Sequence, residues 1–145
     1  MISKEQNIQL EAAVPANQVF YDLISDYIYQ WTKQGFLIEY DWCYCSTLIA
    51  VYTPYVHRLL DNISSNIMKY ADKDYPVQIK MASKEKIFYL SVQNRRSKKD
   101  LENTSTQIGL KNIFVMMKKM NGECEIKIEK DIFSIVIFFP EISTS

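Results

Sequence analysis

Glycine is scarce in this chain of 145 residues, and its scarcity limits what the chain can bind. Only Gly35, Gly109 and Gly122 are present, whereas an average usage of about 7% would give roughly ten. Loops that cradle phosphate groups depend on glycine, because its backbone can approach a ligand closely and adopt a positive φ. Few such loops can therefore be built here, and any nucleotide site must rely on side chains as well.

Cysteine and histidine are also few. The three cysteines, Cys43, Cys45 and Cys124, form no disulfide framework, and the single histidine is His57. Cys43 and Cys45 alternate along a predicted strand, so they would point to the same face, but a metal site there would lack partners. We expect reduced thiols packed in or near a core.

The chain has no excess of either charge and no long apolar run. Its 17 basic residues balance its 17 acidic residues, so no overall field attracts it to nucleic acid or to anionic lipid. The longest apolar runs, such as residues 132–139, are far shorter than the roughly 20 residues that span a membrane. No secretory signal opens the chain. We expect a cytoplasmic domain without nucleic-acid or membrane contacts of its own.

What is present is enough for one folded domain over residues 1–145, with a core over about 6–140. Apolar residues at helical spacing predict helices, which cover residues 15–34, 53–73 and 108–120. Alternating β-branched and aromatic residues predict strands, which cover residues 8–13, 36–44, 47–52, 77–81, 87–93, 123–129 and 132–139. This order predicts an α/β (α+β) fold, a two-layer sandwich in which three main helices lie on one face of a mixed sheet.

Local signals set several boundaries. Gly35 is a natural residue to follow a helix C-terminus, and Thr53 followed by Pro54 is typical of a helix start. Residues 83–86 and Lys130–Asp131 are expected to form hairpin turns. The polar segment 95–106 has almost no apolar residue and is predicted to be a mobile loop.

The predicted helix around residues 58–72 carries the most informative pattern. Its polar residues recur at i, i+4, i+7 and i+8, which places them along one face: Asn62, Asn66, Lys69 and Tyr70. Apolar residues interleave with them and are expected to enter the core: Leu59, Leu60, Ile63 and Ile67. Two carboxamides, an amine and a phenol in one stripe can hold a metal, a phosphate and a flat ring. The alternative for the stripe considered alone is an exposed polar helix face.

This run resembles the N box of sensor histidine kinases, which are Bergerat-fold (GHKL) ATPases, and the order of elements over residues 6–140 is similar to their catalytic domain. The resemblance implies that Asn66 binds magnesium, that Lys69 contacts phosphate, and that the ring of Tyr70 lies against the nucleotide. It also places Asn62 in the ATP site. Magnesium takes oxygen ligands and often only one or two from protein, and lysine supplies a point charge for phosphate.

A second segment, residues 105–110, resembles the second glycine box of the same family, usually Gly-x-Gly-x-Gly-Leu. There a loop enters a helix whose N-terminal N–H groups meet the phosphates. The resemblance implies ATP contacts at Thr106, Gln107, Ile108, Gly109 and Leu110. Ser105 and Gln107 replace two glycines, and Gln107 could crowd the phosphates.

The first glycine box departs further from the family pattern, Asp-x-Gly-x-Gly. The predicted strand 87–93 is followed by Asn94-Arg95-Arg96-Ser97, with neither aspartate nor glycine. Asn94 can still accept a hydrogen bond from the adenine amino group, without charge, and can rotate its amide to suit guanine. We therefore predict only a modest preference for ATP over GTP. Basic residues in the loop are either a solvated charge run or lid residues that close on the γ-phosphate: Arg95, Arg96, Lys98 and Lys99.

The resemblance predicts a kinase rather than a hydrolase. Hydrolases of this fold carry a glutamate base one turn before the metal-binding asparagine, where this chain has Asn62, which cannot take a proton. Asp61 is adjacent but rotated by about 100°. His57 lies inside the nucleotide domain, whereas the family's phosphoacceptor histidine lies on a separate dimerisation domain.

The predicted function is therefore the ATP-binding catalytic domain of a two-component sensor histidine kinase. It would use ATP and Mg²⁺, partner the dimerisation domain of the same kinase, and serve a response regulator indirectly. The full-length protein is expected to be membrane-anchored. The alternative is a degenerate module with little nucleotide binding that acts through protein contacts.

Overall fold

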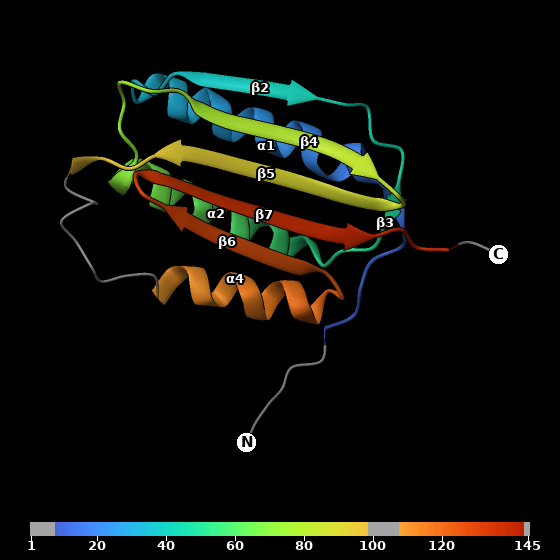
Figure 1. Ribbon diagram of the computed structural model, residues 1–145. Coiled ribbons are helices and arrows are strands. Elements are labelled where there is room, and N and C mark those ends of the chain that lie inside the picture. The colour runs from blue at the N-terminus through green and yellow to red at the C-terminus, as the bar shows by residue number, and fades with distance from the viewer. Residues whose placement is uncertain (1–7, 99–107, 144–145) are drawn as a thin grey trace.

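The computed structural model describes residues 8–98 and 108–143. Five strands form one sheet in the order β2-β4-β5-β7-β6, and the helices cover one of its faces (Figure 1). The strands are β2 (Ile38–Trp42), β4 (Val77–Lys84), β5 (Ile87–Arg95), β6 (Glu123–Glu129) and β7 (Ile132–Pro140). The helices are α1 (Ala16–Lys33), α2 (Thr53–Tyr70) and α4 (Ile108–Lys119). None of them is long and apolar enough to cross a membrane.

The sheet is mixed, as predicted. β2 pairs in parallel with β4, and the other neighbouring strands are antiparallel. A second, very small sheet joins β1 (Val14–Pro15) to β3 (Leu48–Ile49). The predicted two-layer sandwich with three helices on one face is confirmed.

The core lies between the sheet and the helices because apolar side chains alternate along the strands. In β7 every second residue is buried, namely Phe133, Ile135, Ile137 and Phe139. Phe88 of β5 stacks on Phe20 of α1 with ring centroids 5.3 Å apart. The opposite face of the sheet carries polar residues and has no helix on it (Figure 1).

Two of the three glycines are used by the fold itself. Gly35 follows α1 with φ +98°, the left-handed conformation expected after a helix C-terminus. A Cβ at Gly122 would lie 2.5 Å from the carbonyl oxygen of Phe138 and 2.7 Å from Cε of Met117. Only Gly109 therefore remains for contact with a phosphate.

The β4–β5 and β6–β7 hairpin turns form without glycine. Glu85 and Lys86 connect β4 to β5 with φ of 55° and 65°, which is the two-residue type I′ geometry that suits twisted strands. This turn is tighter than the predicted 83–86 because both strands extend further. The predicted turn at Lys130–Asp131 is confirmed, with φ 54° at Lys130.

Two predictions about element boundaries were wrong. Residues 8–13 form no strand; β1 covers Val14–Pro15 alone. Thr53 is the first helical residue rather than the N-cap. The carboxylate of Glu11 does the capping, since it accepts the Thr53 backbone N–H at 2.7 Å and the Thr53 hydroxyl at 2.5 Å. A negative charge at a helix N-terminus is favourable, and this partner is 42 residues away in sequence.

Candidate nucleotide-binding site

The buried side of α2 is as the sequence predicts. Leu59, Leu60, Ile63 and Ile67 are all buried in the core. Ser64 also faces inward, where it accepts a hydrogen bond of 2.8 Å from the indole N–H of Trp31 on α1. A signal for this position was present in the sequence, since Ser64 lies four residues after Leu60 and three before Ile67, whereas Ser65 falls off this row.

The other side of α2 presents the predicted polar stripe. Asn62, Asn66 and Tyr70 are half-buried, and Lys69 is exposed. Asn62 is engaged by a neighbouring group. Within residues 8–98 and 108–143, no hydrogen bond or ion pair occupies Asn66 or Lys69. Their carboxamide and ammonium groups are therefore free to meet a ligand.

The end of α2 is tied to the end of β5. The backbone N–H of Ser97 donates to the carbonyl of Tyr70 at 2.7 Å, and that of Asp72 donates to the carbonyl of Arg95 at 2.8 Å. Ala71 and Arg96 form an isolated bridge between these bonds. The N-box helix and the segment in the place of the first glycine box are thus held side by side. The sequence carries no local signal for this long-range connection.

Asn94 lies at this junction on the helix-covered face of β5. It follows Phe88, Leu90 and Val92 in the strand alternation and is 3% exposed. Its Nδ2 donates to the carbonyl of Arg95 at 3.1 Å. One N–H of the carboxamide is thereby engaged, and its oxygen and second N–H remain. The amide is therefore less free to rotate than the sequence alone suggested.

The helix α4 begins at the same end of the molecule where α2 and β5 end (Figure 1). Its first turn contains Ile108, Gly109 and Leu110, as expected if backbone N–H groups at a helix start meet phosphates. Leu110 itself is buried in the core, so only its backbone can serve a ligand. Thr106 and Gln107 lie outside the described residues.

Two basic residues are not available as lid residues. Arg95 is the last residue of β5; its guanidinium pairs with Asp131 and lies 4.1 Å from the ring centroid of Tyr75. Arg96 donates through Nη1 to the carbonyl of Lys130 at 3.3 Å. The prediction of a loop from residue 95 is therefore wrong for these two residues, because the β6–β7 turn holds them. Lys99 lies outside the described residues.

The acid and the histidine near the stripe are also placed away from it. Tyr27 of α1 donates its hydroxyl to Asp61, and burial together with this carboxylate raises the pKa of Tyr27 well above its usual range. Asp61 thus faces α1. His57 is exposed in the first turns of α2, nine residues before Asn66 and so about 14 Å along the axis at ~1.5 Å per residue.

Of the residues that the structure describes at this site, Asn66 is the candidate magnesium ligand. Among the described residues, no three His, Cys, Asp or Glu side chains gather where they could hold a metal. The half-buried Asn66 supplies a neutral oxygen, and magnesium commonly completes such a shell with water and phosphate oxygens. The donor set therefore fits Mg²⁺ bound together with a nucleotide rather than alone.

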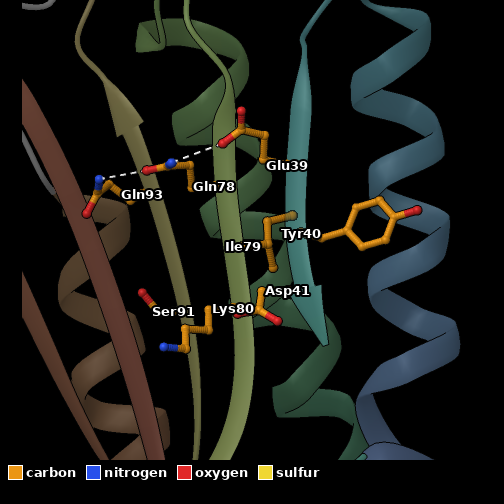
Figure 2. Close-up of a pocket in the computed structure, with 8 residues that line it drawn as sticks. All are labelled: Glu39, Tyr40, Asp41, Gln78, Ile79, Lys80, Ser91 and Gln93. Atoms are coloured by element: carbon orange, nitrogen blue, oxygen red, sulfur yellow. Dashed lines mark hydrogen bonds between the residues drawn. The ribbon is translucent and has the colours of Figure 1, made fainter. Parts of the chain in front are cut away.

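A hollow lies elsewhere on the described part of the molecule. It has a volume of about 400 Å³ and lies on the open face of the sheet, between Glu39, Gln78 and Lys80 (Figure 2). The polar stripe of α2 is on the opposite, helix-covered side. The polar stripe therefore does not line this hollow.

The fold is that of histidine kinase catalytic domains. The nucleotide-free catalytic domain of the histidine kinase ThkA superposes with a TM-score of 0.71 over 92% of this chain and 98% of its own, at 10% identity. The cytoplasmic segment of the histidine kinase QseC gives 0.68, 12% identity, and 92% and 80% coverage. The Acinetobacter baumannii histidine kinase AdeS gives 0.69, 11% identity, and 95% and 70% coverage.

One histidine kinase is also similar to this chain in amino-acid sequence. The sensor histidine kinase YrkQ of Bacillus subtilis (strain 168) is 32% identical over 123 residues, which are 85% of this chain. This chain spans 28% of the length of that protein. No family model matches the chain. The resemblance to a GHKL-type ATP-binding domain of a sensor histidine kinase is confirmed by these relatives.

Proposed function

We propose that this chain binds Mg-ATP at the end of α2 and delivers the γ-phosphate to a histidine on a dimerisation domain outside the chain. The observation that carries the proposal is the polar stripe, in which Asn66 and Lys69 are free while the apolar side of the same helix is buried. Asn66 would bind the magnesium, Lys69 the phosphates, and Tyr70 the nucleotide ring. The backbone at Ile108 and Gly109 would meet the phosphates at the start of α4.

The arrangement favours transfer over hydrolysis. Asn62 occupies the position where a hydrolase needs a proton acceptor. The nearest carboxylate in sequence, Asp61, accepts a hydrogen bond from Tyr27 and faces α1. An imidazole from another domain is a nucleophile that needs no base, so positioning and charge neutralisation carry the step. A response regulator would then receive the phosphate from that histidine.

Two observations favour the alternative, a degenerate module that binds little nucleotide and acts through protein contacts. Two of the three glycines serve the fold, and Asn94 is nearly buried with its Nδ2 bound to the backbone. A tight fit at the base and the lack of glycine for contacts with the phosphates would both lower affinity. The two functions therefore differ in whether Mg-ATP binds at all.

Thermal unfolding and calorimetry with a non-hydrolysable ATP analogue separate them. With magnesium and analogue at 100 times the dissociation constant, the proposal expects about 2.7 kcal/mol of added stability. Chelation of the metal should remove most of it. No shift at millimolar analogue, in a chain that unfolds cooperatively, would establish the alternative.

Phosphotransfer is tested separately with γ-labelled ATP. We expect the chain alone to stay unlabelled, and the dimerisation domain of the same kinase, added in trans, to acquire acid-labile phosphate. A His57→Ala variant should transfer as well as the unchanged chain. Acid-labile phosphate on His57 itself would contradict the assignment of the acceptor to another domain.

A further inference from the structure

Among residues 8–98 and 108–143, no strand pairs with the outer backbone edge of β2. Along its inner side, the carbonyl of Leu37 accepts the N–H of Val77 at 2.8 Å. At the far end, the N–H of Cys43 donates to the carbonyl of Met81 at 3.0 Å. Backbone groups alternate in direction along a strand. Three residues therefore direct N–H and C=O toward the free edge: Ile38, Tyr40 and Trp42.

Both acidic side chains of β2 lie on the open face of the sheet. Glu39 and Asp41 are exposed and pair in register with Gln78 and Lys80 of β4, beside the hollow in Figure 2. Glu39 accepts a hydrogen bond of 3.1 Å from Nε2 of Gln78. A strand added at this edge would bring its own side chains directly opposite these two carboxylates.

Aromatic residues line the other side of the same edge. Tyr40 is 58% exposed, and its ring centroid is 5.3 Å from that of Trp42. Trp42 in turn meets Tyr21 of α1 at 6.3 Å, and Tyr21 is 50% exposed. Tyrosine and tryptophan are enriched where proteins bind one another. Apolar side chains of an added strand would lie against this cluster.

A second copy of this chain does not suit the edge. In an antiparallel pair of two β2 strands, every register that keeps the faces aligned and overlaps three or more residues of β2 sets an acid against an acid: Glu39 against Asp41, Glu39 against Glu39, or Asp41 against Asp41. Like charges directly opposite one another destabilise a strand pair. The carboxylates instead complement a strand with basic residues at the facing positions.

We propose that β2 binds an extended segment of a protein partner that carries Lys or Arg at alternate positions and apolar side chains between them. The main chain of the segment would add a sixth strand through Ile38, Tyr40 and Trp42. Its basic side chains would meet Glu39 and Asp41, and its apolar ones Tyr40 and Trp42. This surface is independent of the nucleotide site.

The opposite edge of the sheet offers a matched control. β6 also places acids on the open face, Glu123, Glu125 and Glu129, but Lys127 interrupts them in the same row. Its other side carries Cys124, Ile126 and Ile128 and lacks an aromatic cluster. The β6 edge therefore carries acidic residues without an aromatic cluster, and it serves as a control for charge alone.

The test uses the whole 145-residue chain and a nine-residue peptide of alternating lysine and valine, blocked at both ends. Hydrogen exchange measured by NMR should slow at least tenfold for the amides of Ile38, Tyr40 and Trp42. The amides of Glu39 and Asp41 already face β4 and should change little. A peptide of alternating glutamate and valine should bind at least tenfold more weakly.

Variants then separate the contributions. Glu39→Lys with Asp41→Lys should lose at least tenfold in affinity for the lysine peptide, and Tyr40→Ala several-fold, at unchanged unfolding midpoints. Glu123→Lys with Glu125→Lys should bind as the unchanged chain does. Unchanged exchange at the three edge amides, equal binding of the glutamate peptide, or equal loss in the β6 variant would each overturn the proposal.

Discussion

The two sides of α2 carry opposite kinds of information. On the inner side, Leu59, Ile63 and Ile67 are buried, and each contributes to stability through packing. On the outer side, Asn66 and Lys69 are free among the described residues and contribute nothing visible to the fold. One helix of 18 residues thus carries the packing residues on one side and the groups proposed to bind the nucleotide on the other.

A helix face that binds a ligand can be distinguished from one that is only solvated. A helix face that only meets water tolerates any polar residue, whereas a face that serves a ligand must keep particular groups free and aligned. Here the neighbouring acid Asp61 is held by Tyr27, and the nearby Arg95 and Arg96 are held by the β6–β7 turn. Substitutions on the two sides should therefore affect different measurements.

The largest effect is expected from the inner side. Leu59→Ala should lower the free energy of unfolding by about 2–5 kcal/mol, because a fully buried side chain leaves a cavity. Chemical denaturation measures this loss, and Ser65→Ala on the exposed surface should stay within about 0.5 kcal/mol. If Leu59→Ala remained folded and lost only nucleotide binding, the separation of the two sides would be refuted.

The second largest effect is expected from a substitution on the outer side of α2. Asn66→Ala should weaken Mg-ATP binding by about a hundredfold, or ~2.7 kcal/mol, through loss of a magnesium ligand. Its unfolding free energy should match that of Ser65→Ala. Calorimetry with magnesium and with chelator is the measurement. Equal affinities under both conditions in the unchanged chain would remove the metal role from Asn66.

A smaller effect is expected where a polar group lies on the inner side. Ser64→Ala would leave the buried indole N–H of Trp31 without its acceptor, at a cost of about 2 kcal/mol. Nucleotide affinity, corrected for the folded fraction, should not change. Stability equal to that of Ser65→Ala would mean that Trp31 finds another acceptor.

The smallest effect is expected at Asn94, which lies where the end of β5 meets the end of α2. Asn94→Asp should tighten ATP and sharpen its preference over GTP by about 1 kcal/mol, because a carboxylate accepts from adenine and repels the guanine carbonyl. The same change removes the donor to the Arg95 carbonyl, so the free protein should lose stability. Competition binding of both nucleotides to both variants is the measurement. An unchanged ATP/GTP ratio would show that Asn94 does not touch the base.

Local pattern was sufficient for most of the fold. The spacing of apolar residues predicted α1, α2 and α4 to within a few residues, and strand alternation predicted β4 to β7. Short elements were predicted poorly. β3 covers two residues where six were expected, because so short a strand consists of one or two backbone pairs and leaves no side-chain pattern in the sequence. The roles of Asn66, Lys69, Tyr70 and Asn94 stay predictions.

The sequence by itself determined the stripe on α2, its buried opposite side and the order of the elements. These follow from periodicity within one helix or strand, where neighbours lie within four residues. Tertiary structure decided which polar groups were left free. Asp61 is held by a tyrosine 34 residues away, Arg95 by an aspartate 36 residues away, and Thr53 by a glutamate 42 residues away. Such partners meet only when the sheet and helices pack, since no local spacing brings them together.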